Sequence, residues 1–259
     1  MTKLRDQVAI VTGGGRGIGR AVAETLAALG ASVVVASRNA PELDTVVRAI
    51  RGAGGRALAQ TADVSDERQV EDLVLATERW VGPASILVNN AGTIEPLAPL
   101  ARSDPALWLR NIAVNIGGTY MPTRAVLPWM LERGAGRIVN VIGHQPAPGL
   151  SAASTSKGGV VQLTRTLAIE LEHTGVTVCA YDPGPVDTAL LRRMQRASAD
   201  DLRAAEGDRA QEQAGRVRSP KDAARVIAYL TLATTHRNGQ MLPMDDADLA
   251  RAVEDALPG

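Results

Sequence analysis

The sequence predicts an α/β fold in which a doubly wound parallel sheet of about seven strands carries helices on both faces. Short apolar runs alternate with longer helical patterns along the chain. The strongest of these runs are apolar at nearly every position, which is typical of strands covered on both sides. The chain has 259 residues, 45% of them apolar, and no repeat or linker-like tract divides it. We therefore expect one domain over residues 1–259.

The elements of this sheet can be placed in order. The expected strands are 8–12, 32–37, 56–64, 86–90, 137–142, 176–181 and 239–244, of which 56–64 is weak and Pro243 interrupts the last. The expected helices are 17–29, which Gly30 closes, then 41–51, 66–80, 104–133, 152–172 and 220–233.

Two further segments are helix-prone but do not fit the alternation. Residues 187–216 are charged and Ala-rich, and they follow the sixth strand at the sheet edge where ligands bind in such folds. They are either a lid over a substrate or a pair of surface helices. Residues 245–259 have Asp caps and place Leu249, Val253 and Leu257 at four-residue spacing, which predicts an extra C-terminal helix docked on its own or another subunit.

Composition excludes several classes of function. Basic and acidic side chains balance at 28 each, so we expect no nucleic-acid partner. No apolar stretch approaches the roughly 18 residues of a membrane span, and the N-terminal apolar run is too short for a signal peptide. The single cysteine, Cys179, excludes an internal disulfide and sits in an apolar run. We expect a cytoplasmic protein without membrane contact or metal site.

A glycine-rich turn, "TGGGRGIG" (12–19), joins the first strand to the first helix. Glycines permit a tight turn there, and they let backbone N–H groups and the helix N-terminus approach a pyrophosphate. Because strand, turn and helix agree, the segment predicts dinucleotide binding.

The end of the second strand predicts which dinucleotide is bound. An acidic residue there would bind a ribose 2′-hydroxyl, but this chain has Ser37, Arg38 and Asn39, with Arg16 in the glycine loop. Arginine makes charge-assisted bonds to phosphate, so we expect NADP(H) to be preferred over NAD(H). The alternative is that both arginines are solvated surface charges.

Five motifs in order carry a resemblance to a known family: "TGGGRGIG", "NNAG" (89–92), Asn115 in "AVNIGG", "TSK" ending at Lys157, and "PGPVDT" (183–188). The chain resembles the classical short-chain dehydrogenase/reductase family, which implies a Rossmann fold and a small-molecule substrate. The resemblance implies cofactor contacts at Gly13, Gly17, Ile18 and Gly19 for the pyrophosphate, Asp63 and Val64 for the adenine, Asn89, Ala91 and Gly92 for the ribose and central sheet, and Pro183, Gly184, Val186 and Thr188 for the nicotinamide end. It also implies a homotetramer or homodimer packed through helices 104–133 and 152–172.

The chain departs from this family at the residues that handle the proton. The family places a tyrosine four residues before the lysine and a serine on the loop after the fifth strand, with the lysine and an asparagine supporting them. Here Lys157 and Asn115 remain, but these two positions are Ala153 and Gly143, and the loop 143–152 is about three residues shorter. Losing a general acid typically lowers a rate by about 10²–10⁴. The retained lysine therefore indicates cofactor binding rather than redox catalysis.

Several readings of this site follow. His144 and Ser151 are candidate substitutes for the acid, with Ser154 and Tyr181 as weaker ones. We favour an oxidoreductase with a non-standard proton donor. The alternatives are a non-redox cyclase, isomerase or eliminase of specialised metabolism with the cofactor structural or absent, an inactive partner subunit, and a Tyr→Ala change introduced at position 153 to trap a ligand. This last alternative does not explain Gly143 or the shortened loop.

Overall fold

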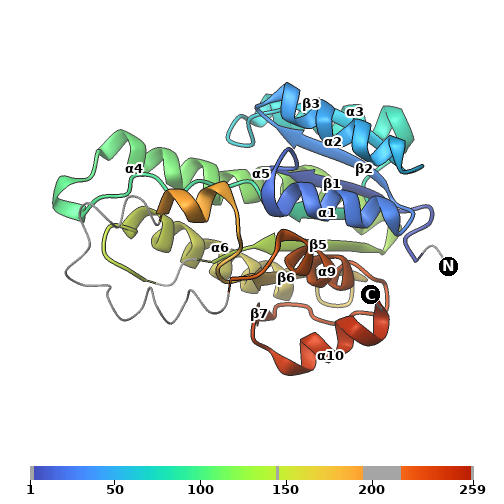
Figure 1. The fold of residues 1–259 in the computed structure, drawn as a ribbon. Coiled ribbons are helices and arrows are strands. Elements are labelled where there is room, and N and C mark those ends of the chain that lie inside the picture. The colour runs from blue at the N-terminus through green and yellow to red at the C-terminus, as the bar shows by residue number, and fades with distance from the viewer. Residues whose placement is uncertain (1–2, 144–145, 195–216, 258–259) are drawn as a thin grey trace.

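The computed structural model of the protein describes residues 3–143, 146–194 and 217–257 (Figure 1). Seven parallel strands form one sheet in the order β3-β2-β1-β4-β5-β6-β7. The strands are β1 (Val8–Thr12), β2 (Ser32–Ser37), β3 (Arg56–Thr61), β4 (Ile86–Asn89), β5 (Gly136–Val141), β6 (Val176–Asp182) and β7 (Met241–Pro243). The order reverses between β1 and β4, and such switch points are where doubly wound sheets bind ligands.

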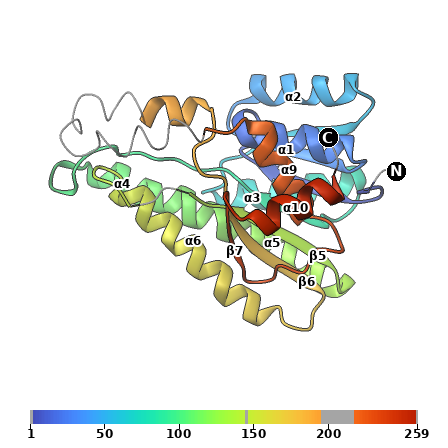
Figure 2. The ribbon, with the colours of Figure 1, turned by 60° about the horizontal axis from the view of Figure 1, so that its bottom comes forward.

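Helices cover both faces of the sheet. They are α1 (Gly17–Ala28), α2 (Ala40–Gly52), α3 (Glu67–Val81), α4 (Pro105–Ile112), α5 (Gly118–Arg133), α6 (Ser151–Glu170), α9 (Pro220–Leu230) and α10 (Ala247–Ala256). One apolar cluster joins the sheet to α1, α2, α9 and α10, and a second joins its other face to α3, α5 and α6. Figure 2 shows α5 and α6 on the side of the sheet opposite to α9 and α10. The predicted α/β fold is confirmed.

The predicted elements agree with the structure except at a few boundaries. The expected strand 56–64 ends at Thr61, and the expected strand 239–244 shrinks to Met241–Pro243 because Pro243 has no N–H to extend a ladder. The single helix expected over 104–133 is interrupted by a π-helical segment, Ala113–Gly117. Residues 189–194 of the expected lid are helical, whereas 195–216 lie outside the described residues.

The site lies at the end of the molecule where the strands finish. The helix that begins at residue 189 lies close to α4 and to the beginning of α6, at the left of Figure 1. An ion pair between Arg193 and Glu95 ties that helix to the loop after β4. In the part of the chain that is described, no helix has the length and apolar character needed to cross a bilayer.

Candidate functional site

The glycine-rich loop between β1 and α1 has the backbone that its sequence predicts. Gly13 has a φ of +64°, a conformation that favours glycine. A side chain on Gly19 would place its Cβ 2.3 Å from the carbonyl oxygen of Gly13, so only a glycine lets the first turn of α1 pack on the loop. The loop therefore fits a pyrophosphate, which would meet bare backbone at the N-terminus of α1, a twelve-residue helix.

Asn90, which the sequence reasoning did not single out, fastens this loop to the end of β4. Its side-chain nitrogen donates to the carbonyls of Thr12 at 3.0 Å and Gly13 at 3.2 Å. The Thr12 hydroxyl accepts in return from the backbone N–H groups of Asn90 and Ala91, both at 3.1 Å. The four bonds fix the switch point between β1 and β4. The signal was present in the sequence as the second asparagine of "NNAG".

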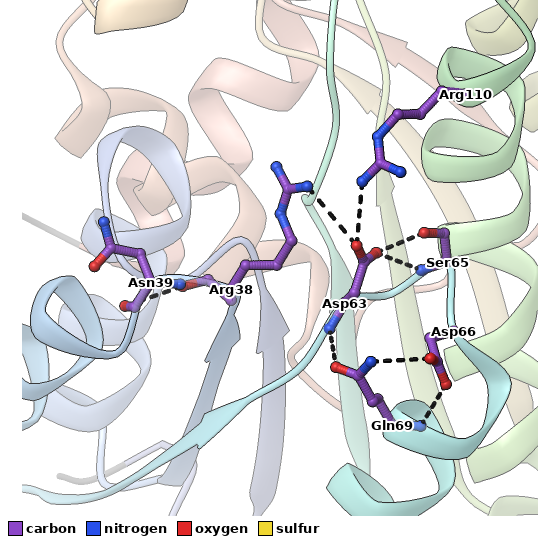
Figure 3. A network of polar contacts seen from close by, with 8 residues as sticks. Arg38, Asn39, Asp63, Ser65, Asp66, Gln69 and Arg110 are labelled. Atoms are coloured by element: carbon purple, nitrogen blue, oxygen red, sulfur yellow. Dashed lines mark hydrogen bonds and ion pairs between the residues drawn. The ribbon is translucent and has the colours of Figure 1, made fainter. Parts of the chain in front are cut away.

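Asp63 is the centre of a polar network next to the end of β2 (Figure 3). Its carboxylate pairs with Arg38 at 3.7 Å and Arg110 at 3.3 Å, and it accepts from the hydroxyl of Ser65 at 2.6 Å. Partial burial would raise the pKa of Asp63, but the bonds from Ser65 and the charges of Arg38 and Arg110 hold it below its ordinary value. The predicted adenine-side residue and one predicted phosphate ligand are thus brought together.

Arg16 and Ser37 lie near a second carboxylate, that of Glu42. Arg16 Nη1 is 3.9 Å from Glu42 Oε1. A Cβ on Gly15 would lie 3.2 Å from Glu42 Oε2 and 3.3 Å from the hydroxyl of Ser37, so all three groups border the glycine loop. The sequence reasoning missed Glu42, because it lies on α2 and reaches the loop only through the fold.

Lys157 and Asn115, the two retained catalytic candidates, meet around Gly92. A Cβ on Gly92 would lie 3.1 Å from Asn115 Oδ1 and 3.5 Å from Lys157 Nζ. Gly92 follows β4, Asn115 lies in the π-helical segment and Lys157 on α6. A side chain at residue 92 would therefore crowd both groups, which explains why the last residue of "NNAG" is glycine.

A buried amide network holds Asn115 in place. Its side-chain nitrogen donates to Asn111 Oδ1 at 2.8 Å, Ser156 Oγ at 2.8 Å and the Thr93 carbonyl at 2.9 Å, while its oxygen accepts from the Thr93 N–H at 2.8 Å. Asn111 also donates to the carbonyl of Glu95 at 2.7 Å. The network ties α4 and α6 to the loop after β4, and neither Asn111 nor Ser156 was among the predicted site residues.

Lys157 is buried and has few partners. Its Nζ donates to the carbonyl of Val141 at the end of β5 at 2.8 Å. Burial lowers the pKa of Lys157 to about 8, and the negative charge of Asp182 at the end of β6 opposes this shift. Lysine in this state titrates much closer to neutrality than a lysine in water.

The two positions that lack hydroxyls differ from each other. Ala153 lies one turn before Lys157 on α6 and has no exposed surface. Gly143 has a φ of +135°, and a Cβ there would lie 3.4 Å from Asp182 Oδ1. The position that the resemblance assigns to a serine therefore has a backbone conformation that favours glycine and lies beside a carboxylate.

The predicted substitute acids differ in their burial and hydrogen-bond partners. Ser151 accepts a hydrogen bond from the indole N–H of Trp108 at 3.2 Å, so it has a structural partner on α4. Ser154 Oγ and Tyr181 Oη are buried without a partner among the described residues. Tyr181 is fully buried, and burial raises its pKa to about 12. His144 lies outside the described residues.

The remaining predicted cofactor residues lie at the same sheet edge or just beneath it. Asn89 is buried and donates to Thr123 at 3.0 Å and Asn140 at 2.9 Å, which commits its side chain to the sheet interior. Thr188 contributes a methyl group 3.3 Å from the Cβ position of Gly17, so the segment after β6 touches the phosphate loop. The other predicted cofactor residues are Ile18, Val64, Ala91, Pro183, Gly184 and Val186, of which Val64, Pro183 and Val186 are buried.

A hollow of about 420 Å³ opens beside the start of α6. It is lined by Pro99, Leu100, Pro146, Ala147, Pro148, Gly149, Ser151, Ser154 and Thr155. Within the described ranges, no group of three or more His, Cys, Asp or Glu side chains is arranged to hold a metal ion. Cys179 is buried, and burial raises its pKa to about 12.

Comparison with known proteins gives this geometry a context. A family model described as short chain dehydrogenase matches residues 7–199. Cis-4-hydroxycyclohexanecarboxylate dehydrogenase of Sinomonas cyclohexanicum is 38% identical over 228 residues, which cover 87% of this chain and 89% of the relative. A short chain dehydrogenase of Pseudocercospora fijiensis is 39% identical over 193 residues, which cover 73% of this chain but only 62% of the relative.

A solved structure shares the fold over almost the whole chain. A variant of actinorhodin polyketide ketoreductase, solved with NADPH, superimposes with a TM-score of 0.84 at 35% sequence identity. The superposition covers 92% of this chain and 95% of the ketoreductase.

Proposed function

Because the chain belongs to the short chain dehydrogenase family, we propose that it is an NADP(H)-dependent oxidoreductase acting on a carbonyl or alcohol group of a small molecule, with a proton donor other than the family's tyrosine. One observation carries the proposal: the residues expected to hold the cofactor lie together at the ends of the strands. The glycine loop is shaped for a pyrophosphate, and Lys157 and Asn115 converge on Gly92. Only the two hydroxyls of the proton-handling half are missing.

The chain's own residues divide the work as follows. When bound, the reduced nicotinamide supplies a hydride to a carbonyl carbon. Gly13, Gly17 and Gly19 would present backbone to the pyrophosphate, and Lys157 would hold the nicotinamide ribose. Asn115 would hold the loop after β4 close to Lys157, because its side-chain amide bonds both to Thr93 in that loop and to Ser156, the neighbour of Lys157 on α6.

The preference for NADP(H) rests on the cationic groups at the adenosine end. Arg16, Arg38 and Arg110 outnumber Glu42 and Asp63 there, so one positive charge is left over. The guanidiniums of Arg16 and Arg38 are exposed in these pairs, at 3.9 and 3.7 Å from their partners, and pairs of exposed charges contribute only about 0–1 kcal/mol. Both guanidiniums are therefore free to turn to a 2′-phosphate, with Ser37 beside them. The ketoreductase solved with NADPH favours the same choice.

Calorimetric titration with NADPH and with NADH tests this proposal. Charge-assisted bonds are worth about 1.5–3 kcal/mol. We therefore expect Arg38→Ala to weaken NADPH binding by roughly 10- to 100-fold. NADH binding should change little. The matched control is Arg79→Ala, which removes an exposed arginine from α3. Failure of the wild-type protein to bind either nucleotide would overturn the proposed function.

The substrate is proposed to be a compact, largely apolar molecule. Prolines, Ala147 and Leu100 dominate the hollow beside α6, and Ser151, Ser154 and Thr155 are its polar residues. Such a lining suits a carbon ring with a few polar groups. The relatives provide the first compounds to assay, cis-4-hydroxycyclohexanecarboxylate and a polyketide ketone.

A second candidate function is a non-redox reaction, such as a cyclisation, isomerisation or elimination. The observation in its favour is that neither Ala153 nor Gly143 carries a hydroxyl. Product formation without a change in NADPH absorbance would support it and exclude hydride transfer. An inactive subunit would bind NADPH and convert no substrate, alone or with the cofactor.

We further propose that the chain forms one domain, works in the cytoplasm and assembles as a homotetramer or homodimer. The two long helical segments, α4–α5 and α6, carry exposed apolar side chains that would face a partner copy. Nucleic acid is not an expected partner because the net charge is zero, and a membrane is not expected because no apolar stretch is long enough to span one.

A further inference from the structure

Asp182 lies beside Gly143, the position that the resemblance assigns to a serine. It is the last residue of β6, and its Oδ1 accepts from the backbone N–H of Gly184 at 2.9 Å. The same oxygen lies 3.4 Å from the Cβ position of Gly143. A carboxylate, rather than a hydroxyl, therefore borders the side of the site that β5 and its loop provide.

Asp182 also lies next to the end of β5 that Lys157 contacts, because it follows Tyr181, the register partner of Val141, and the Val141 carbonyl accepts from Lys157 Nζ. The other groups around the lysine come from the loop after β4, the π-helical segment and β5, namely Gly92, Asn115 and the Val141 carbonyl, and none of them carries a charge. Among the described residues, the charge of Asp182 alone shifts the titration of Lys157 beyond the effect of burial. His144, which follows Gly143, is outside the described residues.

We propose that Lys157 is itself the proton donor of this site, directly or through one water, and that Asp182 positions and stabilises its charged form. This inference rests on the proposed function and adds the missing acid to it. Ala153, one turn before Lys157, carries no proton that could be donated, so another group of the site has to supply it.

The proposed step balances without any further reactant. In reduction, a hydride reaches the carbonyl carbon, and the carbonyl oxygen gains the electron pair of its π bond. That oxygen takes a proton as one N–H bond of the Lys157 ammonium breaks and an O–H bond forms. Lys157 is left as a neutral amine and regains a proton from solvent. Oxidation of an alcohol runs the same transfers in reverse.

The titration of Lys157 suits this role. A general acid works best when its pKa lies near the working pH. Burial brings the pKa of Lys157 down to about 8, so at neutral pH it is charged and yet able to release a proton. An ordinary lysine, with a pKa about two units higher, would hold its proton more tightly.

The experiment compares wild type with Asp182→Asn and Lys157→Arg in two measurements. The first is an NMR titration of labelled lysine side chains without cofactor, which is simple because Lys3, Lys157 and Lys221 are the three lysines of the chain. Lys157→Arg assigns the signal. The second is the pH profile of kcat/KM for NADPH-dependent reduction. Asp72→Asn, on the exposed side of α3, is the charge-matched control.

We expect the wild-type rate to fall above about pH 8, as Lys157 loses its proton. Asp182→Asn should move both this falling limb of the pH profile and the NMR titration of Lys157 to lower pH, because the negative charge that favours the ammonium is gone. Lys157→Arg should lower kcat by about 10²–10⁴ and abolish the limb, since arginine keeps the charge but does not release a proton. Asp72→Asn should leave the high-pH limb, the NMR titration of Lys157 and kcat unchanged.

Each failure has a distinct meaning. If the protein binds NADPH but transfers no hydride to any substrate, both the proposed function and this inference are wrong. If hydride transfer occurs but the limb stays in place in Asp182→Asn, or persists in Lys157→Arg, only this inference is overturned. A limb that disappears instead in His144→Ala would assign the proton to the histidine.

Discussion

Gly143 has a backbone conformation that a serine adopts only under strain, because its φ is +135°. The absence of a hydroxyl at this position therefore goes together with a different loop conformation and is not a simple exchange of one side chain. A single Tyr→Ala change at position 153 does not account for this backbone. Adding Ser at 143 and Tyr at 153 would therefore not recreate the family's usual site without moving the loop.

Gly143→Ser should lower the free energy of unfolding by about 1–3 kcal/mol, the usual range for a residue in a sparsely populated conformation. Urea unfolding measures the change. Gly158→Ala is the control, because Gly158 lies in α6 with nothing within 4 Å of its Cβ position. That variant should gain up to about 1 kcal/mol, since alanine favours a helix. Equal stability of wild type and Gly143→Ser would show that the loop accommodates a side chain.

Tyr181 offers a second test at the same scale. Its ring is buried in the apolar cluster with α1 and α9, and its hydroxyl has no partner among the described residues. An unsatisfied buried hydroxyl carries a desolvation penalty of about 1–3 kcal/mol. Tyr181→Phe should therefore leave the free energy of unfolding unchanged or raise it. A loss above about 1 kcal/mol would mean that the hydroxyl is satisfied after all.

At the scale of elements, apolar periodicity was sufficient to place the strands and helices. The burial of all five β1 residues agrees with the continuous apolar run from which that strand was predicted. The break of the 104–133 helix at Asn115 was not predictable from periodicity. It arises where the Asn115 side chain bonds to three elements at once, and side-chain partners from distant segments leave no periodic trace.

The C-terminal helix docks on its own chain, which decides between the two predicted arrangements. Leu249, Val253 and Leu257 are buried in the cluster that α10 shares with α9. Arg225 on α9 pairs with Glu254 at 2.8 Å. Leu249→Ala should lower the free energy of unfolding by about 2–5 kcal/mol, as for other buried leucines. Leu75→Ala, at an exposed site on α3, should change it by less than about 0.5 kcal/mol in the same unfolding experiment. Equal losses in both variants would contradict the docking.

For the whole molecule, the sequence predicted which residues gather at the sheet edge but not how they pair. Lys157, Asn115 and the glycine loop followed from motifs. The approach of Glu42 to the glycine loop, and the position of Asp182 beside Gly143, depend on how α2 and β6 pack against neighbouring elements. Contacts of this kind depend on the angle between elements, which a linear pattern does not contain.

The predicted assembly concerns a surface that the fold leaves uncovered. Leu109 on α4 is 64% exposed and Ile169 on α6 is 68% exposed, although both are large apolar side chains. In the proposed assembly, these side chains and the exposed Trp129 and Leu131 on α5 would face a partner copy. A charge placed there would have to be buried without a partner when two copies pack, which is strongly unfavourable.

Ile169→Arg should therefore shift the protein to a smaller species, as measured by light scattering on a size-exclusion column, with unchanged circular dichroism. Leu75→Arg, which places the same charge on exposed α3, should keep the wild-type mass. If Ile169→Arg also keeps that mass, α6 does not form the interface. If wild type itself runs as a monomer, the assembly proposal is wrong. The site would then be complete within one chain, since Lys157, Asn115, Asp182 and the glycine loop all come from it.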